Sequence, residues 1–299
     1  MTKNKSTITG ALFLGALIWG AGTVFIQVCL QGGLVTGSQM FLRFWIGAVC
    51  LAIASRKKLN HISRRMVVCS AVCGTFLFFA FFIFTQGVEN TTPANASFLS
   101  ATNIMFIPFL SWLMLKFRPE KKIFLGCAIC LVGVAVLSLQ IEGGLHFTPG
   151  DLLVLLSALF FSFHACFVAK LGAGFDPTLF TFSQITVVAL WSTVTLPISG
   201  ADLSVVGKDI PALICVIILG LFNTALCYLI QMKGQRVLPP TRVSLILSTE
   251  SLFGAVFSVL MGYDPFSLRL VVGGGIMMLA ILLVETDLLI PKKKRPVSA

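Results

Sequence analysis

The amino-acid sequence predicts an all-α polytopic membrane protein with ten transmembrane helices in two inverted five-helix repeats. Three features indicate this class: the composition, the placement of the basic residues, and an internal repeat. The 299 residues are 57% hydrophobic and only 11% charged, whereas soluble domains carry about 25% charged residues. A chain of this composition cannot cover a water-soluble surface with polar side chains.

Ten apolar runs are long enough to cross a hydrocarbon core of about 30 Å, and glycine, proline and charged residues separate them. The first run follows "MTKNKSTITG" and is too long for the core of a signal peptide, so we expect it to be a span. The expected spans cover residues 10–30, 37–54, 66–86, 93–115, 122–140, 150–170, 177–197, 210–231, 241–261 and 267–287.

The basic residues alternate between the loops that follow successive spans. With the amino terminus inside, 19 of the 22 Lys and Arg residues lie on the inner side, Lys208 and Arg269 lie outside, and Arg43 lies within a span. Positive charge in cytoplasmic loops is the rule for plasma-membrane proteins, so we expect a multi-pass protein of the plasma (inner) membrane with both termini cytoplasmic. The same placement explains the net charge of +11 without a nucleic-acid partner.

An internal repeat relates the two halves of the chain. "SFLSATNIMFIPFLSWLMLKFRP" (97–119) aligns without a gap with "VSLILSTESLFGAVFSVLMGYDP" (243–265), a separation of 146 residues that pairs Ile104 with Glu250. We expect repeats over residues 1–141 and 142–290, followed by a basic cytoplasmic tail over 291–299. Because each repeat has five spans, the second is inverted, an arrangement typical of secondary transporters that work by alternating access.

Several segments resemble the EamA-type members of the drug/metabolite transporter superfamily. They are "ALIWGAGTVF" (16–25), "FLRFWIGAV" (41–49), "TTPANASFLSATNIMFIP" (91–108), "GDLLVLLSALFFSFHA" (150–165) and "STES" (248–251). The resemblance implies an EamA-like basket around a central cavity, lined mainly by spans one, three, four, six, eight and nine. It also implies export of amino acids or other small metabolites. Many members carry an acidic residue after spans four and nine, where this sequence has "KFRP" and "GYDP", and this departure bears on the subfamily more than on the fold.

The predicted function is that of a secondary transporter that exports small neutral or zwitterionic metabolites, amino-acid-like solutes among them. The alternatives are a membrane-embedded enzyme or assembly factor that reuses the fold, and a translocator of nucleotide sugars or lipid-linked sugars. A nucleotide-sugar substrate would call for several cationic side chains in the cavity. Arg43 is the one Lys or Arg away from the ends of an expected span, so neutral or zwitterionic substrates are favoured. The sequence has no phosphate-binding GxxxxGK loop and no hydrolase motif, so we expect no catalytic residue, no cofactor and no metal. A small-molecule substrate and the lipid bilayer are the expected partners, and a proton or an exchanged solute is left open as the coupling species.

Two titratable residues are candidates for the transport site. Glu250 lies within span nine beside a stripe of small polar residues, and a charge at the bilayer centre costs about 2.5–3.5 kcal/mol on insertion scales, so it is expected to face protein or a wet cavity. His164 in span six would suit proton coupling, or it is a hydrogen-bonded core residue. Arg43 can snorkel outward, bridge helices or, as a third alternative, contact the substrate.

The remaining candidates are polar or aromatic residues within spans, which either join helices or line the cavity. Trp19, Thr23 and Tyr228 are included because of the family resemblance. The full expected substrate-binding set is Trp19, Thr23, Phe82, Gln86, Asn103, His164, Asn223, Tyr228, Ser248 and Glu250.

Overall fold

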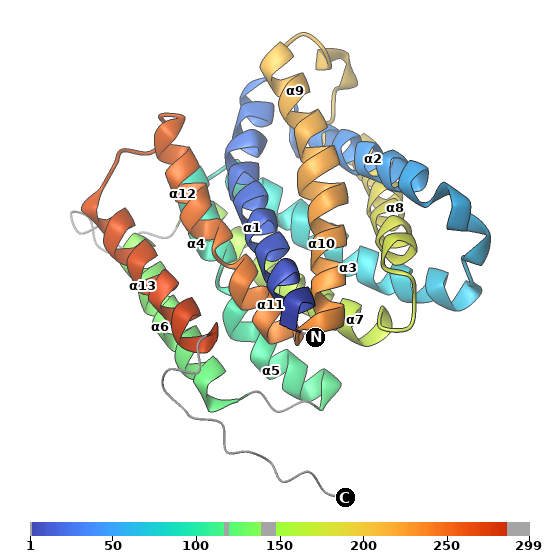
Figure 1. Cartoon of the computed structure of the whole chain (residues 1–299). Helices are drawn as coiled ribbons and strands as arrows, with labels where there is room; N and C mark the ends of the chain where they lie inside the picture. Colours follow the sequence, from blue (N-terminus) through green and yellow to red (C-terminus); the bar gives the residue numbers. More distant parts are fainter. Residues whose placement is uncertain (1, 117–119, 139–147, 286–299) are drawn as a thin grey trace, which may run out of the picture.

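The computed structural model describes residues 2–116, 120–138 and 148–285. This part of the chain consists of helices and their connections, without a strand (Figure 1). Eight of its helical segments are long and apolar enough to cross a membrane. An all-α multi-pass membrane protein, as predicted, is confirmed.

The helices of the first half begin with three long, uninterrupted elements and continue with a broken one. They are α1 (Thr2–Gln31), α2 (Thr36–Ser55), the short 3₁₀ helix η1 (Arg56–His61), α3 (Arg64–Val88), α4 (Pro93–Ser100), α5 (Asn103–Leu115) and α6 (Lys121–Ser138).

The second half follows the same order. Its elements are α7 (Pro149–Leu171), α8 (Pro177–Thr195), the 3₁₀ turns η2 (Leu196–Ile198) and η3 (Leu203–Val205), α9 (Ile210–Ile218), the π-helix η4 (Leu219–Leu226), α10 (Cys227–Val237), α11 (Pro240–Leu247), α12 (Glu250–Leu260) and α13 (Leu268–Glu285). The span expected over 210–231 therefore continues to Val237, because the helix extends past Lys233 and ends only before Pro239 and Pro240.

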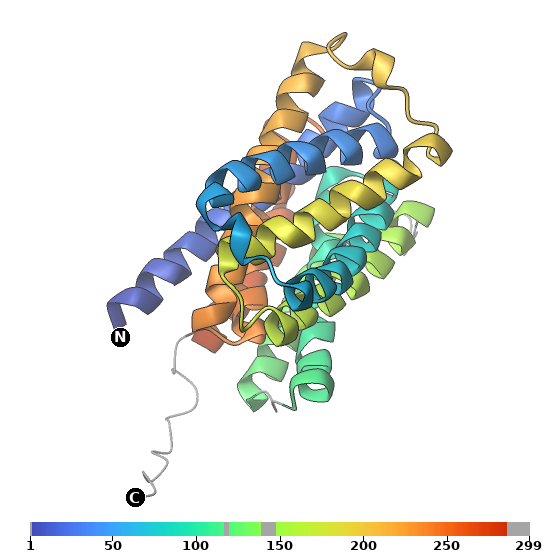
Figure 2. The ribbon, with the colours of Figure 1, turned by 90° about the vertical axis from the view of Figure 1, so that its right-hand side faces the viewer.

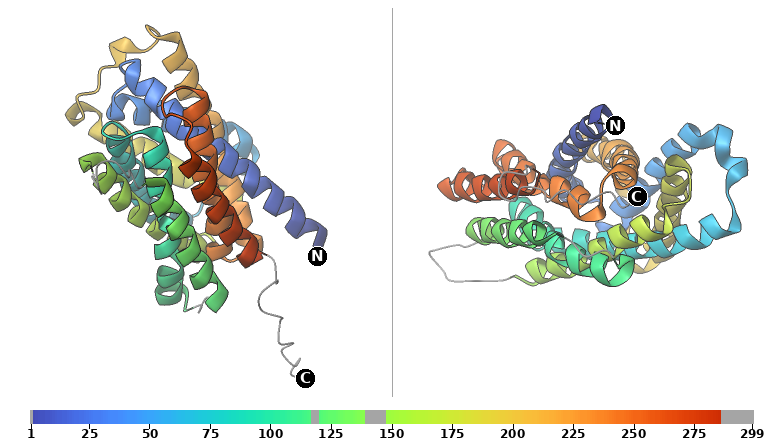
Figure 3. Two further views of the ribbon diagram at one scale, coloured as in Figure 1. Left: turned by 90° about the vertical axis from the view of Figure 1, so that its left-hand side faces the viewer. Right: turned by 60° about the horizontal axis from the view of Figure 1, so that its bottom comes forward.

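The helices α6 and α13 correspond to the fifth and tenth expected spans. Each has 18 residues, a length of about 27 Å that is close to the hydrocarbon thickness. They pack against each other at one edge of the bundle, as the views in Figures 1 and 3 show. With them, the ten expected segments each have a helical counterpart. The last residues of both expected spans and the basic tail at 291–299 lie outside the described residues.

The fourth and ninth segments are each broken in the middle, which the sequence analysis did not predict. At the first break Thr102 N–H bonds Leu99 O, and the Thr102 hydroxyl donates to the same carbonyl at 2.6 Å. At the second break Thr249 does the same with Ile246, at 2.7 Å for the hydroxyl. Threonine hydroxyls that bond the preceding turn bend helices, and short 3₁₀ turns often mark hinges.

These breaks show that the two repeats correspond at a separation of 147 residues here, one more than the alignment predicted. Pro93 and Pro240 begin the first half-helices, and Asn103 and Glu250 begin the second. Glu250 is therefore the counterpart of Asn103 rather than of Ile104. The gapless alignment missed this because similar apolar residues in long helices match almost equally well in neighbouring registers.

Helix packing follows the same pseudo-twofold relation. Helix α1 packs on α12 just as its counterpart α7 packs on α5, and α1 packs on α11 just as α7 packs on α4. In the same way α3 packs on α7, and the segment α9–η4–α10 packs on α1. The remaining elements pair with their own counterparts, α2 with α8 and α6 with α13, and Figure 2 shows α2 and α8 side by side. Each repeat thus completes the core of the other.

The two ends of the bundle carry opposite charges. We call the end at which α1 begins, α2 and α10 end and α3 begins the basic end (Figure 1); Lys57, Lys58, Lys121, Lys170, Lys233 and Arg236 lie there. We call the opposite end the acidic end; Glu89, Asp151, Asp202, Asp209 and Asp264 lie there. The three-dimensional arrangement therefore has the charge asymmetry that the positive-inside rule requires.

Two glycines illustrate the close helix contacts outside the cavity. A Cβ on Gly74 would lie 2.6 Å from Gln184 O and 2.6 Å from Val187 Cβ, and one on Gly220 would lie 2.6 Å from Ile46 Cγ2. Each contact joins the two repeats: Gly74 of α3 faces α8, and Gly220 of η4 faces α2. Small residues at such contacts let helix backbones approach closely in membranes.

We expect Gly74→Ala to lower the free energy of unfolding by about 1–3 kcal/mol, because the added methyl group forces α3 away from α8. Gly275→Ala is the matched control, since nothing lies within 4 Å of its Cβ position. It should leave stability unchanged or raised, because alanine is the better helix former. Denaturant titrations in detergent would measure both. Equal effects of the two substitutions would contradict the close-packing account.

Candidate functional site: a central cavity between the two repeats

A central cavity of about 90 Å³ lies between the repeats. Its wall comes from α1, α3, α4–α5, α7, η4–α10 and α11–α12, with Arg43 of α2 as the one contribution from another described segment. The residues that line it are Trp19, Gly20, Gly22, Thr23, Ile26, Arg43, Phe81, Phe84, Ser97, Ser100, Asn103, Ile107, Phe161, His164, Ala165, Asn223, Tyr228, Gln231, Gln235, Pro240, Ser244, Leu247 and Glu250.

The lining residues form pairs under the repeat relation. At the separation of 147 residues, Ser97 pairs with Ser244, Asn103 with Glu250, Phe81 with Tyr228 and Phe84 with Gln231. The segments 16–25 and 158–167 add three pairs, namely Trp19 with Phe161, Gly22 with His164 and Thr23 with Ala165. The same positions of both repeats thus face one cavity, but their chemistry differs: the second repeat supplies the carboxyl group, the imidazole and the phenol.

Trp19 forms the link between α1 and the π-helix η4. Its indole Nε1 donates to Asn223 O at 2.8 Å, and the Asn223 side-chain amide donates to Ile18 O at 2.8 Å. The Trp19 ring contacts the Tyr228 ring edge to face at 5.2 Å between centroids. The Asn223 side-chain oxygen is buried and has no hydrogen-bond partner among the described residues. Asn223 lines the cavity, so a wall residue carries an acceptor that no described residue satisfies.

Arg43 is buried, with 2% of its surface exposed. Its Nε donates to the Thr224 hydroxyl at 2.8 Å, which bridges α2 and η4. The guanidinium lies over the Phe81 ring, 4.4 Å from the centroid, and 5.4 Å from the centroid of Phe44. The side chain does not snorkel outward: it points into the bundle and reaches the cavity wall.

Glu250 begins α12 and lines the cavity, with the Ser100 side chain close to its carboxyl group. Helix α1 approaches this position through Gly20, where a Cβ would lie 2.6 Å from Glu250 O. The absence of a side chain at Gly20 is what lets the start of α12 sit beside the cavity. No cation lies within ion-pair distance of this carboxyl group in the described part of the chain.

His164 and Thr23 line the cavity from α7 and α1. The Nε2 atom of His164 lies 3.0 Å from Gln184 Oε1, and its ring contacts Tyr228 at 5.6 Å between centroids. The Thr23 hydroxyl lies 2.9 Å from the Ser97 hydroxyl and joins α1 to α4. His164 is thus both a hydrogen-bonded core residue and a wall residue, which unites the two alternatives that its sequence position left open.

Three residues of the expected set are placed away from the lining. Phe82 is absent from the lining, and its ring stacks on Phe78 of the same helix at 5.6 Å between centroids. The backbone carbonyl of Gln86 accepts from Asn90, and its side chain is only partly buried. Ser248 is buried, and its hydroxyl donates to Leu245 O at 2.7 Å within the helix break. The other seven residues, Trp19, Thr23, Asn103, His164, Asn223, Tyr228 and Glu250, lie together on the wall.

Sequence reasoning missed several wall residues that the repeat would have identified. Phe81 and Phe84 are hidden in a phenylalanine-rich run, and only their pairing with Tyr228 and Gln231 distinguishes them. The correct separation of 147 residues is needed for that pairing. Ser97, Ser100 and Ser244 would follow from the same register, since they extend the stripe that contains Asn103 and Glu250.

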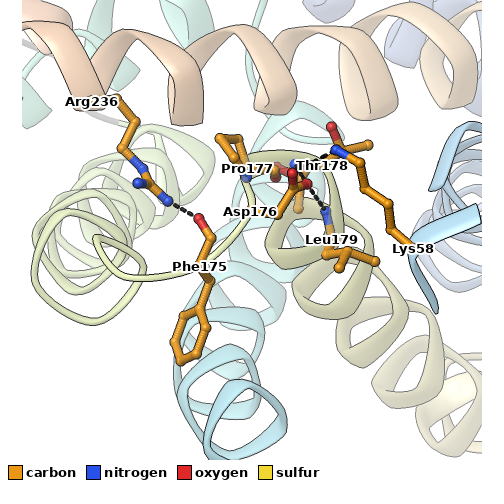
Figure 4. A network of polar contacts seen from close by, with 8 residues as sticks. Lys58, Phe175, Asp176, Pro177, Thr178, Leu179 and Arg236 are labelled. Carbon is orange, nitrogen blue, oxygen red and sulfur yellow. Dashed lines mark hydrogen bonds and ion pairs between the residues drawn. The ribbon is translucent and has the colours of Figure 1, made fainter. Parts of the chain in front are cut away.

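At the basic end, polar contacts join η1 and α10 to the connection between α7 and α8 (Figure 4). Lys58 Nζ lies 2.7 Å from Asp176 Oδ2, and Asp176 also accepts from the backbone N–H groups of Thr178 and Leu179 at the start of α8. Partial burial raises the pKa of the Asp176 carboxyl, but the hydrogen bonds from Lys58 and from these N–H groups outweigh it and hold the pKa below its ordinary value. Arg236 donates to the carbonyls of Gly172 and Phe175.

The chain is similar to known membrane transporters over nearly its whole length. A family model described as the EamA-like transporter family matches residues 7–139 and 148–286. An uncharacterized transporter of Archaeoglobus fulgidus is 26% identical over 274 residues, which cover 92% of this chain and 84% of the relative. The uncharacterized transporter YyaM of Bacillus subtilis is 22% identical over 298 residues, or 94% of each chain. A solved crystal structure has a TM-score of 0.76 at 16% identity over 93% of this chain and 96% of its own, which supports the fold alone.

Cysteine labelling would test the cavity wall in a variant without the nine native cysteines. Ser244→Cys and Asn103→Cys should react with a small aqueous thiol reagent about tenfold or more faster than Ser248→Cys, because thiol reactivity depends on access. Ser248 is the matched control, one turn from Ser244 but outside the lining. Met277→Cys on α13 should also react slowly, since Met277 is fully buried against the neighbouring helices. Equal rates at Ser244 and Ser248 would contradict the placement of the wall.

Proposed function

Because the chain belongs to the EamA-like transporter family, we propose that it is a secondary transporter that exports small neutral or zwitterionic metabolites, amino-acid-like solutes among them. The observation that carries the proposal is the single cavity wall built from equivalent positions of two repeats. A membrane transporter of this family needs a central binding site that both repeats share, and this wall provides one.

The size and polarity of the cavity support a small solute. Its volume of about 90 Å³ is well below the range of about 300–1,000 Å³ that drug-sized ligands occupy. The wall combines aromatic rings with one guanidinium, one carboxyl group, one imidazole and several hydroxyl and amide groups. One cation is too few for a sugar nucleotide with its diphosphate, so a solute with at most one negative charge fits better.

Alternating access follows from the repeat arrangement. We place hinges at the two equivalent helix breaks, before Asn103 and before Glu250, because both breaks adjoin the cavity. The basic end is closed by the contacts around Asp176, and at the acidic end the Tyr263 hydroxyl donates to Gln31 Oε1 at 2.9 Å. Each of these contacts joins the two matched repeats, so exchanging them would open the cavity to one side and then to the other.

We further propose that the protein lies in the plasma membrane with its basic end and both termini in the cytoplasm. The charge difference between the two ends supports this orientation. The repeats are proposed to extend over residues 1–141 and 142–290, as expected from the sequence. A catalytic role for the fold remains the competing hypothesis, and it predicts no net movement of solute.

Solute counterflow in proteoliposomes would test the proposed function. Vesicles preloaded with an unlabelled mixture of L-amino acids should transiently accumulate the radiolabelled mixture from outside, because exchange through one carrier is driven by the preloaded gradient. Vesicles without protein serve as the control. If protein-containing vesicles accumulate no more label than the control vesicles, the proposal of amino-acid-like substrates is wrong.

Glu250 is proposed to change protonation or partner during the cycle. Glu250→Gln keeps the shape but cannot titrate, so gradient-driven efflux should fall about tenfold or more while counterflow is retained, since proton transfer requires a titratable group. In this variant, the dependence of gradient-driven efflux on pH between about 6 and 8 should flatten. Asn103→Asp places a carboxyl group at the equivalent position and is the matched variant for symmetry. Wild-type efflux across this pH range in Glu250→Gln would refute a coupling role.

A further inference from the structure

Arg43 is the exception to the symmetry of the cavity wall. The other lining residues come from α1, α3, α4–α5 and their counterparts in the second repeat, whereas Arg43 comes from α2. It is also the one Lys or Arg on the wall. Packing of the repeats therefore does not explain why a guanidinium lies at this place.

The positive charge of Arg43 has no anionic partner in the described part of the chain. The ion pairs there join Lys58 to Asp176 and Lys122 to Glu120, both at the basic end. Arg43 itself donates one hydrogen bond to a described residue, from its Nε to the uncharged Thr224 hydroxyl. Its two terminal nitrogens make no hydrogen bond to a described residue. An isolated buried charge is costly, and protein structures normally pair it.

The surroundings of Arg43 hold the guanidinium in a fixed position. Thr224 lies within the π-helix η4, one residue after Asn223. The Phe81 ring lies beneath the guanidinium plane at 4.4 Å from its centroid. π-helical turns are rare and occur often at functional sites. Here the π-helix places Thr224 against Arg43, and the preceding residue, Asn223, lines the cavity and has an unpaired side-chain oxygen.

We propose that Arg43 is the anion-binding residue of the transport site and that it takes a single carboxylate of the substrate. The proposal rests on the proposed function, because it assigns a group of the transported solute to one wall residue. The terminal nitrogens of Arg43 form the planar fork that matches a carboxylate with two parallel hydrogen bonds. Asn223, which lines the same cavity, has an unpaired side-chain oxygen that can accept from an N–H or O–H group of the same solute.

Glu250 does not compete for this position. Gly20 of α1 faces the start of α12, and Gly22 of α1 faces Asn223 of η4. Residues two apart on a helix point to nearly opposite sides, so α12 with Glu250 and η4 with the Arg43 site flank α1 on different sides. No ion pair joins Arg43 to Glu250 among the described residues, so the guanidinium is left to take a solute carboxylate.

A carboxylate fits better than a phosphate. A phosphate monoester carries about two negative charges and normally needs several donors or cations, and the wall offers one guanidinium. The aromatic rings around Arg43 would leave a second charge unpaired. Carboxylic acids and amino acids therefore form the ligand class that this part of the wall would select.

Competition in the counterflow assay tests the inference on the wild-type protein. The labelled L-amino acid that is taken up best is competed with itself, with its carboxamide and with its decarboxylated amine. The carboxamide and the amine should each need about tenfold or higher concentrations for half-inhibition, because both lack the charge-assisted pair with Arg43. If the acid and its carboxamide inhibit equally, this result on the wild-type protein alone would overturn the inference.

Substitution of Arg43 assigns the preference to this residue. In Arg43→Gln the difference between acid and carboxamide should shrink to within about twofold, and Arg43→Lys should retain part of it, because lysine keeps the charge but not the fork. Lys208→Gln, which removes an exposed charge outside the cavity, is the matched control and should keep the wild-type preference. A full preference in Arg43→Gln, or its loss in Lys208→Gln, would overturn the assignment.

The two proposals fail in different ways. Absence of counterflow with the whole amino-acid mixture contradicts the proposed substrate class and the carboxylate site with it. Counterflow that does not distinguish the acid from its carboxamide contradicts only the role of Arg43. If Arg43→Gln does not insert in the membrane, the wild-type competition and Arg43→Lys still decide the outcome.

Discussion

Burying Arg43 and Glu250 within apolar helices costs about 2.5–3.5 kcal/mol each on insertion scales, and neither has an ion-pair partner among the described residues. The arrangement of the bundle follows from that cost. Both side chains reach a central cavity rather than lipid, and the hydroxyl groups of Thr224 and Ser100 lie beside them. The polar wall is thus concentrated in one place, and the surrounding helices can remain apolar towards the membrane.

Helix α1 makes this concentration of polar groups possible. Gly20 and Gly22 remove side chains on two sides of the helix, so that α12 and η4 both approach its backbone. Trp19 then spans from α1 to Asn223 and contacts the Tyr228 ring. These contacts join the first repeat to the second at the depth of the helix breaks. The cavity is consequently a product of both repeats, and neither half could form its wall alone.

Composition and the placement of the basic residues are sufficient to predict the helical membrane fold. Both are properties of whole spans and loops, so single residues hardly change them. The repeat was visible, but its register was not: the matches between residues 97–119 and 243–265 are mostly apolar, and only the breaks at Thr102 and Thr249 identify the true pairing. Seven expected site residues lie on the wall, because polar groups inside spans must face protein or water. The same argument does not place Phe82 and Ser248, because a phenylalanine or a serine side chain can be buried away from the cavity at little cost.

We propose that solute moves through the cavity as the two repeats exchange contacts at the two ends. Cysteines at Gln31 and Tyr263 can be bridged by a bifunctional thiosulfonate at the acidic end, where these side chains meet. Cysteines at Lys58 and Asp176 can be bridged at the basic end. In a variant without native cysteines, either bridge should arrest amino-acid counterflow, and a reductant should restore it. Counterflow at the unbridged rate with both bridges formed would contradict alternating access.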